Sequence, residues 1–359
     1  MKVVFIGNSG FCISKQRSEI VKTFIENGHE VIVFSPIDKY VDKLKSLGCK
    51  HVETKMQPKG TNPFKDLKVL KNYKKLLKQI KPDMVFTFTI KPNIYGAWAC
   101  RDLNIPCVAN ITGLGTAVEN GGLIQKITVA LYKIAFKKVK TVFFQNSENM
   151  QFFIDRKIAL GSHKLIPGSG VNLNIFTYED YIDTGVLNFY FVARVMKEKG
   201  IDNFLEAAKY LKEKYQNLTF TVCGACESEY EGILKEHNDK GVICYKGMVD
   251  SVHEAYKDAH CLIHPTYYPE GLCNSLIESL ATGRPIITTD RSGCREVVED
   301  GVNGFIVKQQ NTSDLIEKIE KFIALPFEEK KQMGINGRQK VEKEFDRQIV
   351  INAYLEELN

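Results

Sequence analysis

The sequence predicts an α/β protein that contains two doubly wound parallel sheets in tandem. Short apolar runs alternate with helical patterns twice along the chain, which is the order of elements that forms such sheets. The length of 359 residues also favours two domains over one. Between the two alternations lies a polar, aromatic and acidic stretch, which we interpret as a linker. We expect α/β domains at residues 1–172 and 188–340, a linker at 173–187, and a C-terminal helix at 341–359 that can return to the first domain.

The first half of the chain should contain the first sheet and its covering helices. Each expected strand is a short, mainly apolar run, and each expected helix has apolar residues three and four positions apart. The expected strands are Val3–Ile6, Glu30–Phe34, Met84–Thr87, Cys107–Asn110 and Thr141–Phe144. The expected helices are Ser18–Asn27, Val41–Leu47, Phe64–Ile80, Ile94–Leu103 and Leu123–Lys137.

The second half repeats the pattern and closes with two longer helices. The expected strands are Phe189–Val192, Thr219–Cys223, Val242–Tyr245, Cys261–His264, Pro285–Thr288 and Gly304–Val307. The expected helices are Ile201–Lys214, Glu229–Glu236, Val252–Asp258, Asn274–Ala281, Cys294–Val298, Thr312–Ile323, Phe327–Glu344 and Arg347–Leu358. In sheets of this kind, ligands gather at the carboxyl ends of the strands.

The composition excludes several classes of protein. With 44% apolar and 26% charged residues the chain is typical of globular enzymes, and no run approaches the roughly 18 apolar residues of a membrane span. The N-terminal apolar segment is too short for a signal peptide. The ten cysteines have no framework spacing, so we expect reduced thiols in a cytosol. Cys223 and Cys226 match C-x-x-C, but without a second pair at zinc spacing we favour two ordinary thiols over a redox or metal site.

Residues 264–285 combine a strand end, a turn rich in Pro, Tyr and Gly, and a helix. This order points backbone N–H groups at an anion. Glu270 in the turn and Glu278 in the helix are separated by seven residues. A carboxylate cannot hold a phosphate, so two carboxylates beside an anion site are expected to bind the hydroxyls of a ribose and a sugar. The pattern therefore indicates a nucleotide-sugar pocket.

Structural interpretations of the two acids stay open. Ser275 and Glu278 also fit a capping box, in which Glu278 would be the third residue of the helix. Glu270 could be a solvated acid of the turn.

In each domain, a glycine-containing turn follows the first strand. Arg194 and Lys199 precede Gly200 and a helix, which suits a clamp for a diphosphate, although a solvated basic turn is the alternative. Near the N-terminus, residues 7–10 (Gly-Asn-Ser-Gly) are too short for the dinucleotide fingerprint. They predict either a loop of close approach to a ligand or a plain tight turn.

The ordered motifs resemble retaining glycosyltransferase family four, which has the GT-B fold of two Rossmann-like domains with an interdomain cleft and the E-x7-E motif. The resemblance is carried by Arg194 with Lys199-Gly200, by 246–249 (Lys-Gly-Met-Val), by the two glutamates, by Ala281-x-Gly283-x-Pro285 and by 299–305 (Glu-Asp-Gly-Val-Asn-Gly-Phe). It is specific over about residues 165–320 and looser over the first half, where the order of elements agrees better than the residues do.

The resemblance implies a role for each matched residue. Arg194, Lys199 and Glu270 would be the catalytic group, with the two cations on the donor diphosphate and Glu270 on donor-sugar hydroxyls. Glu278 would bind the ribose. The backbone of Gly271, Leu272 and Cys273 would support the phosphate and sugar, and Gly247 and Val249 would contact the base. This assignment fits the chemistry of the residues, with cations for phosphate and acids for hydroxyls.

The acceptor side departs from the family pattern. Many members place a histidine after the fourth strand, where this chain has no histidine but carries Lys91 and Asn93. Together with residues 110–115, this segment resembles transferases that extend sugars on polyprenyl diphosphates for capsules, O-antigens or glycoprotein glycans. The implied acceptor-binding residues are Asn8, Ser9, Gly10, Lys91, Asn93, Thr112 and Gly113.

The sequence and the resemblance together predict the reaction. We expect a retaining transferase that moves a sugar, with N-acetylhexosamine as the first choice, from a UDP-linked donor to a lipid-linked saccharide. No D-x-D motif occurs, so we expect no metal and no cofactor. The resemblance implies front-face transfer, in which the leaving diphosphate takes the acceptor proton. The rival interpretations are a GT-B nucleotide-sugar epimerase or sugar phosphorylase and a non-catalytic carbohydrate- or membrane-binding module.

The charge is distributed unevenly along the chain. Residues 1–184 carry a net charge of +12 and residues 185–359 carry −6. The basic helical segments 65–81 and 126–140 predict contact with an anionic membrane surface, at the inner face of the cytoplasmic membrane. No motif supports nucleic-acid binding. The alternative is an ordinary amphipathic helix with a solvated basic face, because Leu67, Leu70, Leu77 and Ile80 are expected in the core.

Overall fold

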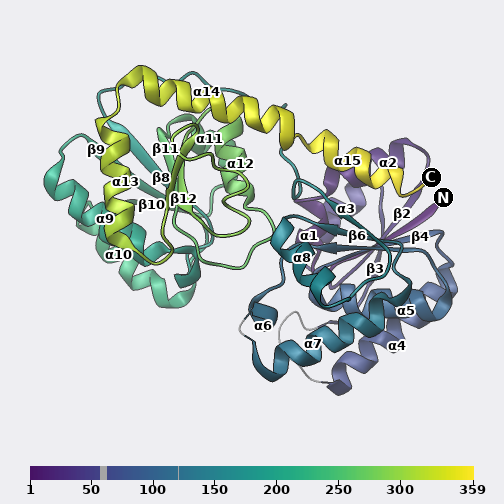
Figure 1. The fold of residues 1–359 in the computed structure, drawn as a ribbon. Helices are drawn as coiled ribbons and strands as arrows, with labels where there is room; N and C mark the ends of the chain where they lie inside the picture. Colours follow the sequence, from purple (N-terminus) through teal and green to yellow (C-terminus); the bar gives the residue numbers. More distant parts are fainter. Residues whose placement is uncertain (57–62, 120) are drawn as a thin grey trace. The chain divides into compact units, whose positions relative to one another are not determined.

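The computed structural model describes residues 1–56, 63–119 and 121–359, and it separates into two compact units (Figure 1). The first unit comprises Met1–Ser169, Pro269–Leu272 and Gln348–Asn359, and the second comprises Gly170–Tyr268 and Cys273–Arg347. The sequence analysis divided the chain at residues 172, 187 and 340. The structure instead assigns a four-residue segment from the middle of the expected second domain to the first unit.

The first unit is built on a seven-stranded parallel sheet with the order β3-β2-β1-β4-β5-β6-β7. The strands are β1 (Lys2–Ile6), β2 (Glu30–Ser35), β3 (Lys50–Glu53), β4 (Met84–Phe88), β5 (Cys107–Ile111), β6 (Thr141–Phe144) and β7 (Ser162–Leu165). The central strands are apolar and buried on both faces, which makes them readable as apolar runs. The edge strands β3 and β7 are polar and partly exposed, and the sequence analysis missed both.

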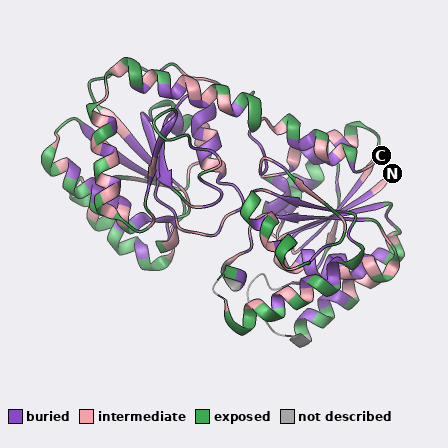
Figure 2. Cartoon of the chain, in the orientation of Figure 1, coloured by how far each residue is buried: buried purple, intermediate pink, exposed green. Residues whose placement is uncertain are grey.

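Helices cover both faces of this sheet (Figures 1 and 2). One face packs on α4, α5 and α7, and the other on α2 and α15. The elements are α1 (Gly10–Ser14), α2 (Ser18–Glu26), α3 (Val41–Ser46), α4 (Pro63–Ile80), the π-helical turn η1 (Pro92–Gly96), α5 (Ala97–Leu103), α6 (Thr116–Glu119), α7 (Gly122–Ala135), η2 (Phe136–Lys138) and α8 (Ser147–Asp155). The expected core position Leu67 on α4 is wrong, because this side chain is 50% exposed, whereas Leu70 and Leu77 are buried.

The last helix, α15 (Arg347–Glu356), is held in the first unit by an aromatic side chain and a buried acid. The ring of Tyr354 lies 5.2 Å from that of Phe86, and its hydroxyl donates a hydrogen bond to Asn110. Glu357 accepts hydrogen bonds from Lys164 (2.9 Å) and Thr141 (2.8 Å). Burial alone would raise the pKa of Glu357, but these bonds and the nearby lysines outweigh it and lower the pKa.

The second unit is built on a six-stranded parallel sheet with the order β10-β9-β8-β11-β12-β13. The strands are β8 (Leu187–Val192), β9 (Leu218–Cys223), β10 (Cys244–Gly247), β11 (Cys261–His264), β12 (Ile286–Thr289) and β13 (Gly304–Val307). The helices are η3 (Lys197–Lys199), α9 (Ile201–Lys214), η4 (Ser228–Tyr230), α10 (Glu231–Asp239), α11 (Val252–Lys257), α12 (Asn274–Ala281), α13 (Thr312–Ala324) and α14 (Phe327–Glu344).

The helix expected at Cys294–Val298 is wrong. The segment forms successive hydrogen-bonded turns instead, such as Val297 N–H to the Cys294 carbonyl (3.0 Å). The Asn303 side chain donates to the Val297 carbonyl (3.2 Å) and accepts from the Glu299 amide (2.8 Å). These bonds use the groups that a continuing helix would need.

Among the described helices, none has both the length and the apolar character that crossing a bilayer requires. The cysteines are free thiols. Cys223 is buried, and burial raises its pKa to about 11, so its thiolate is not available at neutral pH.

Candidate functional site

The second sheet reverses its direction of growth between β8 and β11. The chain runs from β8 outward to β9 and β10 and then returns to β11 on the other side of β8. In open parallel sheets, ligands bind outside the carboxyl ends of the two strands at such a point. The loops that follow these strands, residues 193–200 and 265–273, contain most of the predicted donor-binding residues.

The loop after β8 packs closely against the beginning of the loop after β11. Gly200 has a φ angle of 79°, and a Cβ atom there would lie 2.1 Å from the carbonyl oxygen of Pro265, so glycine is required. The carbonyl of Glu198 accepts hydrogen bonds from the Thr266 hydroxyl (3.1 Å) and the Tyr267 amide (2.9 Å). These contacts hold the turn that contains Arg194 and Lys199 beside the residues that follow β11.

The two predicted cations differ in burial. Arg194 is exposed, whereas Lys199 is only 8% exposed and its ammonium lies 5.3 Å from the ring centre of Tyr268. Gly200 is the N-cap of α9, so the first N–H groups of α9 lie at the same loop. A forked guanidinium, a compact ammonium and a helix N-terminus together complement a diphosphate.

Glu278 lies in the second turn of α12. The extended backbone of Cys273 (φ −84°, ψ 102°) marks the N-cap, so Ser275 is the second helical residue and the capping-box interpretation is wrong. Within the described residues, the Glu278 carboxyl takes part in no side-chain hydrogen bond. Burial raises its pKa to about 7, although the charge of Arg347 acts in the opposite direction. A half-buried carboxyl in this state is a candidate for binding ligand hydroxyls.

Gly247 is the last residue of the edge strand β10, and Val249 follows it by two residues. The carbonyl of Gly247 accepts a hydrogen bond from the Gly224 amide (2.7 Å). Both predicted residues are partly exposed, so their backbone is open to a ligand.

The segment Pro269–Leu272 is fastened to loops of the first unit. The backbone amide of Gly271 donates to the Thr112 carbonyl (3.1 Å). The side-chain amide of Asn146 donates to the backbone carbonyls of Glu270 (3.2 Å) and Gly271 (2.6 Å). A Cβ atom on Gly271 would lie 2.8 Å from the carbonyl carbon and oxygen of Thr112, so this attachment requires glycine. Glu270, Gly271 and Leu272 therefore belong to the first unit, whereas Cys273 and Glu278 belong to the second.

The first sheet has its own reversal point, between β1 and β4. In the loop after β1, the Ser9 hydroxyl caps α1 by accepting from the Cys12 amide (3.3 Å). The Gly10 amide donates to Asp38 (2.7 Å) and is therefore already used. The side chains of Asn8 and Ser9 are partly exposed and remain open to a ligand.

After β4, the predicted residue Asn93 is an internal link. It is 1% exposed, accepts a hydrogen bond from the Thr87 hydroxyl (2.7 Å) and donates to the Asn110 carbonyl (2.8 Å). Asn93 thus joins β4 to β5, and its amide is not available to an acceptor. Thr112 and Gly113 follow β5 and are partly exposed.

Lys91 is held by a partner on α4. Its ammonium lies 2.9 Å from Asp66, which also accepts a hydrogen bond from the Tyr95 hydroxyl (3.1 Å). Two residues earlier, Thr89 has a φ angle of 70°, which is strained for a β-branched residue. Strained residues and π-helical turns such as η1 occur often at functional sites.

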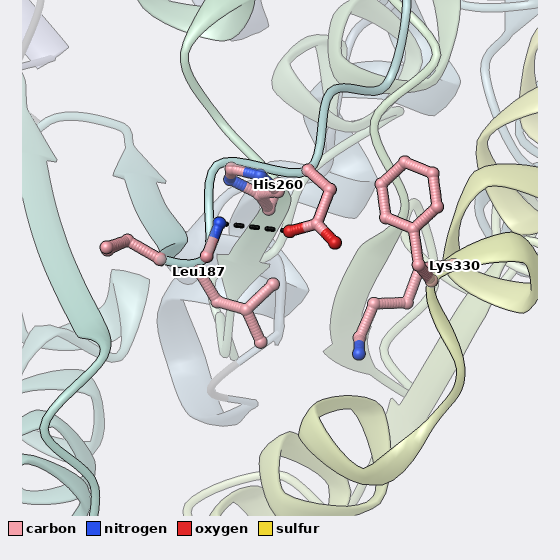
Figure 3. A pocket seen from close by; sticks show the side chains of 7 residues that line it. Leu187, His260 and Lys330 are labelled. Atoms are coloured by element: carbon pink, nitrogen blue, oxygen red, sulfur yellow. Dashed lines mark hydrogen bonds between the residues drawn. The ribbon is translucent and has the colours of Figure 1, made fainter.

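A hollow of about 220 Å³ lies at the opposite end of the second sheet (Figure 3). Leu187, which starts β8, and His260, which precedes β11, line it together with Lys330. Lys330 donates to the carbonyls of Ile323 (2.9 Å) and Leu325 (2.5 Å) at the end of α13, so it caps that helix. This hollow is at the amino ends of the strands, away from the loops that carry the predicted donor residues.

We expect His260 to make folding sensitive to acid. Its Nδ1 accepts a hydrogen bond from the backbone N–H of Asn188 (3.2 Å), and its Nε2 donates to the Ile182 carbonyl (3.0 Å). This pair of bonds fixes the neutral form of the ring. Burial and the charge of Arg284 lower its pKa.

Because the unfolded chain takes up this proton first, the free energy of unfolding should fall as the pH drops below about 6.5, by at most about 1.4 kcal/mol per pH unit. Urea unfolding of the parent and of His260→Gln at a series of pH values tests this. Equal pH slopes for the two proteins would contradict the assignment.

Comparison with known proteins covers almost the whole chain. Residues 181–340 match the family Glycosyl transferases group 1, and residues 2–146 match the family Glycosyl transferase 4-like. The N,N'-diacetylbacillosaminyl-diphospho-undecaprenol alpha-1,3-N-acetylgalactosaminyltransferase of Campylobacter jejuni is 27% identical over 99% of this chain and 97% of its own length.

Solved structures show the same fold. A glycosyltransferase from Rickettsia africae has a TM-score of 0.82 at 20% identity, over 99% of this chain and 97% of that one. Alr3699/HepE of Anabaena in complex with UDP has a TM-score of 0.81 at 17% identity, over 100% of this chain and 99% of that one. The predicted GT-B fold of two Rossmann-like domains and the predicted family resemblance are confirmed.

Four residues at these sites were not predicted. Asn146 had a sequence signal, because it lies two residues after β6 and caps α8. Asp66 and Arg347 lie far along the chain from Lys91 and Glu278, so no local pattern pairs them. The strain at Thr89 is a property of the backbone and has no sequence signal.

Proposed function

This chain belongs to the glycosyltransferases, with a 4-like domain followed by a group 1 domain, and we propose that it transfers an N-acetylhexosamine from a UDP-sugar to a saccharide on a polyprenyl diphosphate. The cationic loop after β8, with Arg194, Lys199 and the N-terminus of α9, supports the donor assignment. The similarity to the Campylobacter enzyme over 99% of this chain supports the acceptor class.

On the donor side, each proposed contact matches the chemistry of its group. Arg194 and Lys199 bind the diphosphate and stabilise the charge that develops on it as the bond to the sugar breaks. Glu278 accepts hydrogen bonds from the ribose hydroxyls, and the backbone at Gly247 and Val249 meets the base. The backbone of Gly271–Cys273 supports the phosphate and sugar, and Glu270 orients the sugar hydroxyls.

We propose that transfer retains the configuration of the sugar. The bond from the anomeric carbon to the diphosphate oxygen breaks, and the acceptor hydroxyl bonds to that carbon on the same face. The acceptor proton passes to the departing diphosphate, which leaves as UDP. In this scheme the leaving group itself accepts the proton, so the step needs no side-chain base.

The acceptor is assigned to loops of the first unit that follow β1, β4 and β5. Asn8, Ser9, Thr112 and Gly113 are partly exposed there, and Lys91 is aimed by Asp66. An acceptor diphosphate or sugar would meet the Lys91 ammonium. We also propose that the enzyme works on the inner face of the cytoplasmic membrane, where a lipid-linked acceptor and a nucleotide sugar can meet.

A direct assay tests the proposed function. The protein is incubated with one UDP-sugar at a time and a saccharide on a short, water-soluble polyprenyl diphosphate, and the products are identified by mass spectrometry. A product heavier by one N-acetylhexosamine is expected, with the anomeric configuration of the donor by NMR. Conversion of the UDP-sugar in the absence of acceptor would indicate the rival epimerase instead.

Asp66→Asn should lower kcat/KM for the acceptor by about tenfold, because the variant keeps its shape but no longer holds the Lys91 ammonium by charge. Steady-state transfer at varied acceptor concentration measures the effect. Asp102→Asn is the matched control. Asp102 lies on α5 and pairs with Lys74 (2.5 Å), which lies on α4 as Asp66 does. Equal activity of both variants would show that the Asp66 pair is only structural.

Transfer should survive EDTA, because the proposed clamp uses two side-chain cations for the diphosphate. The assay above is repeated after dialysis against EDTA, with and without added Mg²⁺ or Mn²⁺. Loss of activity that either metal restores would contradict a metal-independent mechanism.

A further inference from the structure

The outer side of α7 in the first unit is apolar. Leu123 is 73% exposed, Ile124 and Ile127 are each 51% exposed, and Ile134 is 36% exposed. The side that faces the protein is formed by Thr128, Tyr132 and Ala135. Figure 2 shows exposed positions along this helix. The usual pattern of a surface helix, with its apolar stripe toward the core, is therefore reversed here.

The exposed apolar residues form one stripe. Leu123, Ile127, Ala130 and Ile134 are spaced by four, three and four residues, which places them in line along the helix. The stripe lies opposite the side that enters the hydrophobic core of the first unit. Single exposed apolar side chains are normal, but a continuous stripe of them marks a surface that contacts another apolar phase.

The charge beside the stripe has one sign. Lys126, Lys133 and Lys137 are exposed and lie at helical spacing along one border of it. No acidic residue occurs in the sequence between Glu119 and Glu148. An apolar stripe with lysines at its border is typical of helices that lie in the interface of an anionic bilayer.

The other basic helix of the first unit differs in this respect. On α4, the exposed positions are mainly lysines, namely Lys65, Lys68, Lys71, Lys75 and Lys78, and Leu67 is the one large apolar side chain more than a third exposed among its described residues. Of the lysines near these helices, Lys74 pairs with Asp102 and Lys138 donates to Asn104 (2.8 Å). Thus α4 has a solvated basic face, and α7 has an apolar one.

We propose that α7 is a membrane-interface helix, whose stripe Leu123–Ile127–Ala130–Ile134, together with Ile124, enters the outer part of an anionic bilayer. The lysines at the border contact lipid phosphates while the isoleucines lie below them. This inference rests on the proposed function, because an acceptor on a polyprenyl chain stays in the bilayer and the enzyme must reach it there. It goes beyond that function by proposing that the protein binds the membrane through insertion of the apolar side chains of one helix.

Vesicle co-sedimentation tests the proposal with variants that should fold normally, since the changed side chains are exposed. The parent should bind phosphatidylglycerol-containing vesicles better than pure phosphatidylcholine. Binding should weaken but persist at about 0.5 M KCl, because insertion is not screened by salt. The double variant Ile124→Gln/Ile127→Gln should lower the partition coefficient by about tenfold or more.

The matched control is Ile154→Gln/Leu160→Gln, which removes two exposed apolar side chains (43% and 83%) elsewhere in the first unit. It should bind vesicles as the parent does. Equal binding by the α7 double variant and the parent overturns the proposal. So does complete loss of parent binding in salt, which would indicate surface charge alone. Conversion of a dimer to a monomer by the α7 variant, with vesicle binding unchanged, would assign the stripe to self-association instead.

The soluble-acceptor assay keeps this test separate from the proposed function. Transfer to the short-chain acceptor should be equal in the parent and the α7 double variant. If the parent transfers to that acceptor but does not bind vesicles, the membrane inference fails and the proposed function stands. If it binds vesicles through α7 but transfers to no acceptor, the proposed function fails and the membrane inference stands.

Discussion

Lys199→Ala and Arg194→Ala should each lower kcat/KM for sugar transfer by about 100-fold or more. Both residues lie in the loop after β8, at the reversal point of the second sheet, beside the N-terminus of α9. In the proposed mechanism they face a diphosphate that gains negative charge as the sugar leaves. Removing one such preorganised charge commonly reduces catalysis by 10²–10³. The effect of Lys199 should be the larger, because its side chain is 92% buried and its charge is poorly screened.

Lys197→Ala is the matched control for this prediction. Lys197 lies in the same turn, η3, and is exposed, so its loss should change kcat/KM little. Thermal unfolding of all three variants shows whether the fold is intact. Near-normal transfer by both Lys199→Ala and Arg194→Ala would refute the diphosphate clamp.

The strands that could be predicted are those whose burial on both faces requires an apolar sequence. β1, β4, β5 and β11 are buried on both faces, so each appears as an apolar run. β3 and β7 lie at the sheet edges and are stabilised by pairing with β2 and β6, which no local pattern records. The segment near Cys294 was wrongly predicted as a helix for another reason, because apolar spacing does not record that the Asn303 side chain takes the hydrogen-bonding groups of Val297 and Glu299.

The proposed site residues divide in the same way. Arg194, Lys199 and Gly200 could be proposed from the sequence because one short strand–turn–helix segment contains them. The neighbouring sequence could not show that Asn93 and Gly10 are already hydrogen-bonded. Their partners, Asn110 and Asp38, lie in other elements of the first unit. The orientation of α7 was also open in the sequence, since its apolar residues suit either the core or a membrane. Only the burial of Tyr132 and Ala135 in the hydrophobic core of the first unit decides it.

Glu278→Gln is expected to remove the pH dependence of donor binding. With its pKa raised to about 7, the Glu278 carboxyl of the free protein is mostly protonated below that pH. Ribose hydroxyls donate best to the carboxylate, so donor affinity should rise about tenfold per pH unit up to about pH 7 and then level off. Titration calorimetry with UDP-N-acetylglucosamine is the suitable measurement, because its diphosphate is esterified at both ends and does not ionise near pH 7. An identical pH profile in Glu278→Gln would exclude Glu278 from donor binding.

The same substitution should stabilise the protein in alkaline solution. The folded chain keeps the Glu278 proton up to a pH of about 7, whereas the unfolded chain releases it near its ordinary value of 4.5. Stability is therefore lost as the pH rises between these two values and stays lower above them, by about 1–3 kcal/mol for a shift of this size at a half-buried side chain. Gln has no proton to release, so Glu278→Gln should melt at a higher temperature than the parent at about pH 8 and show its smallest gain near pH 4.5. A gain in stability together with weaker donor binding is the signature of a carboxyl kept for function, because a residue that served only to cap α12 would lose stability or leave it unchanged. If Glu278→Gln melts at or below the parent at every pH, the carboxyl is not held in the unfavourable state that the structure assigns to it.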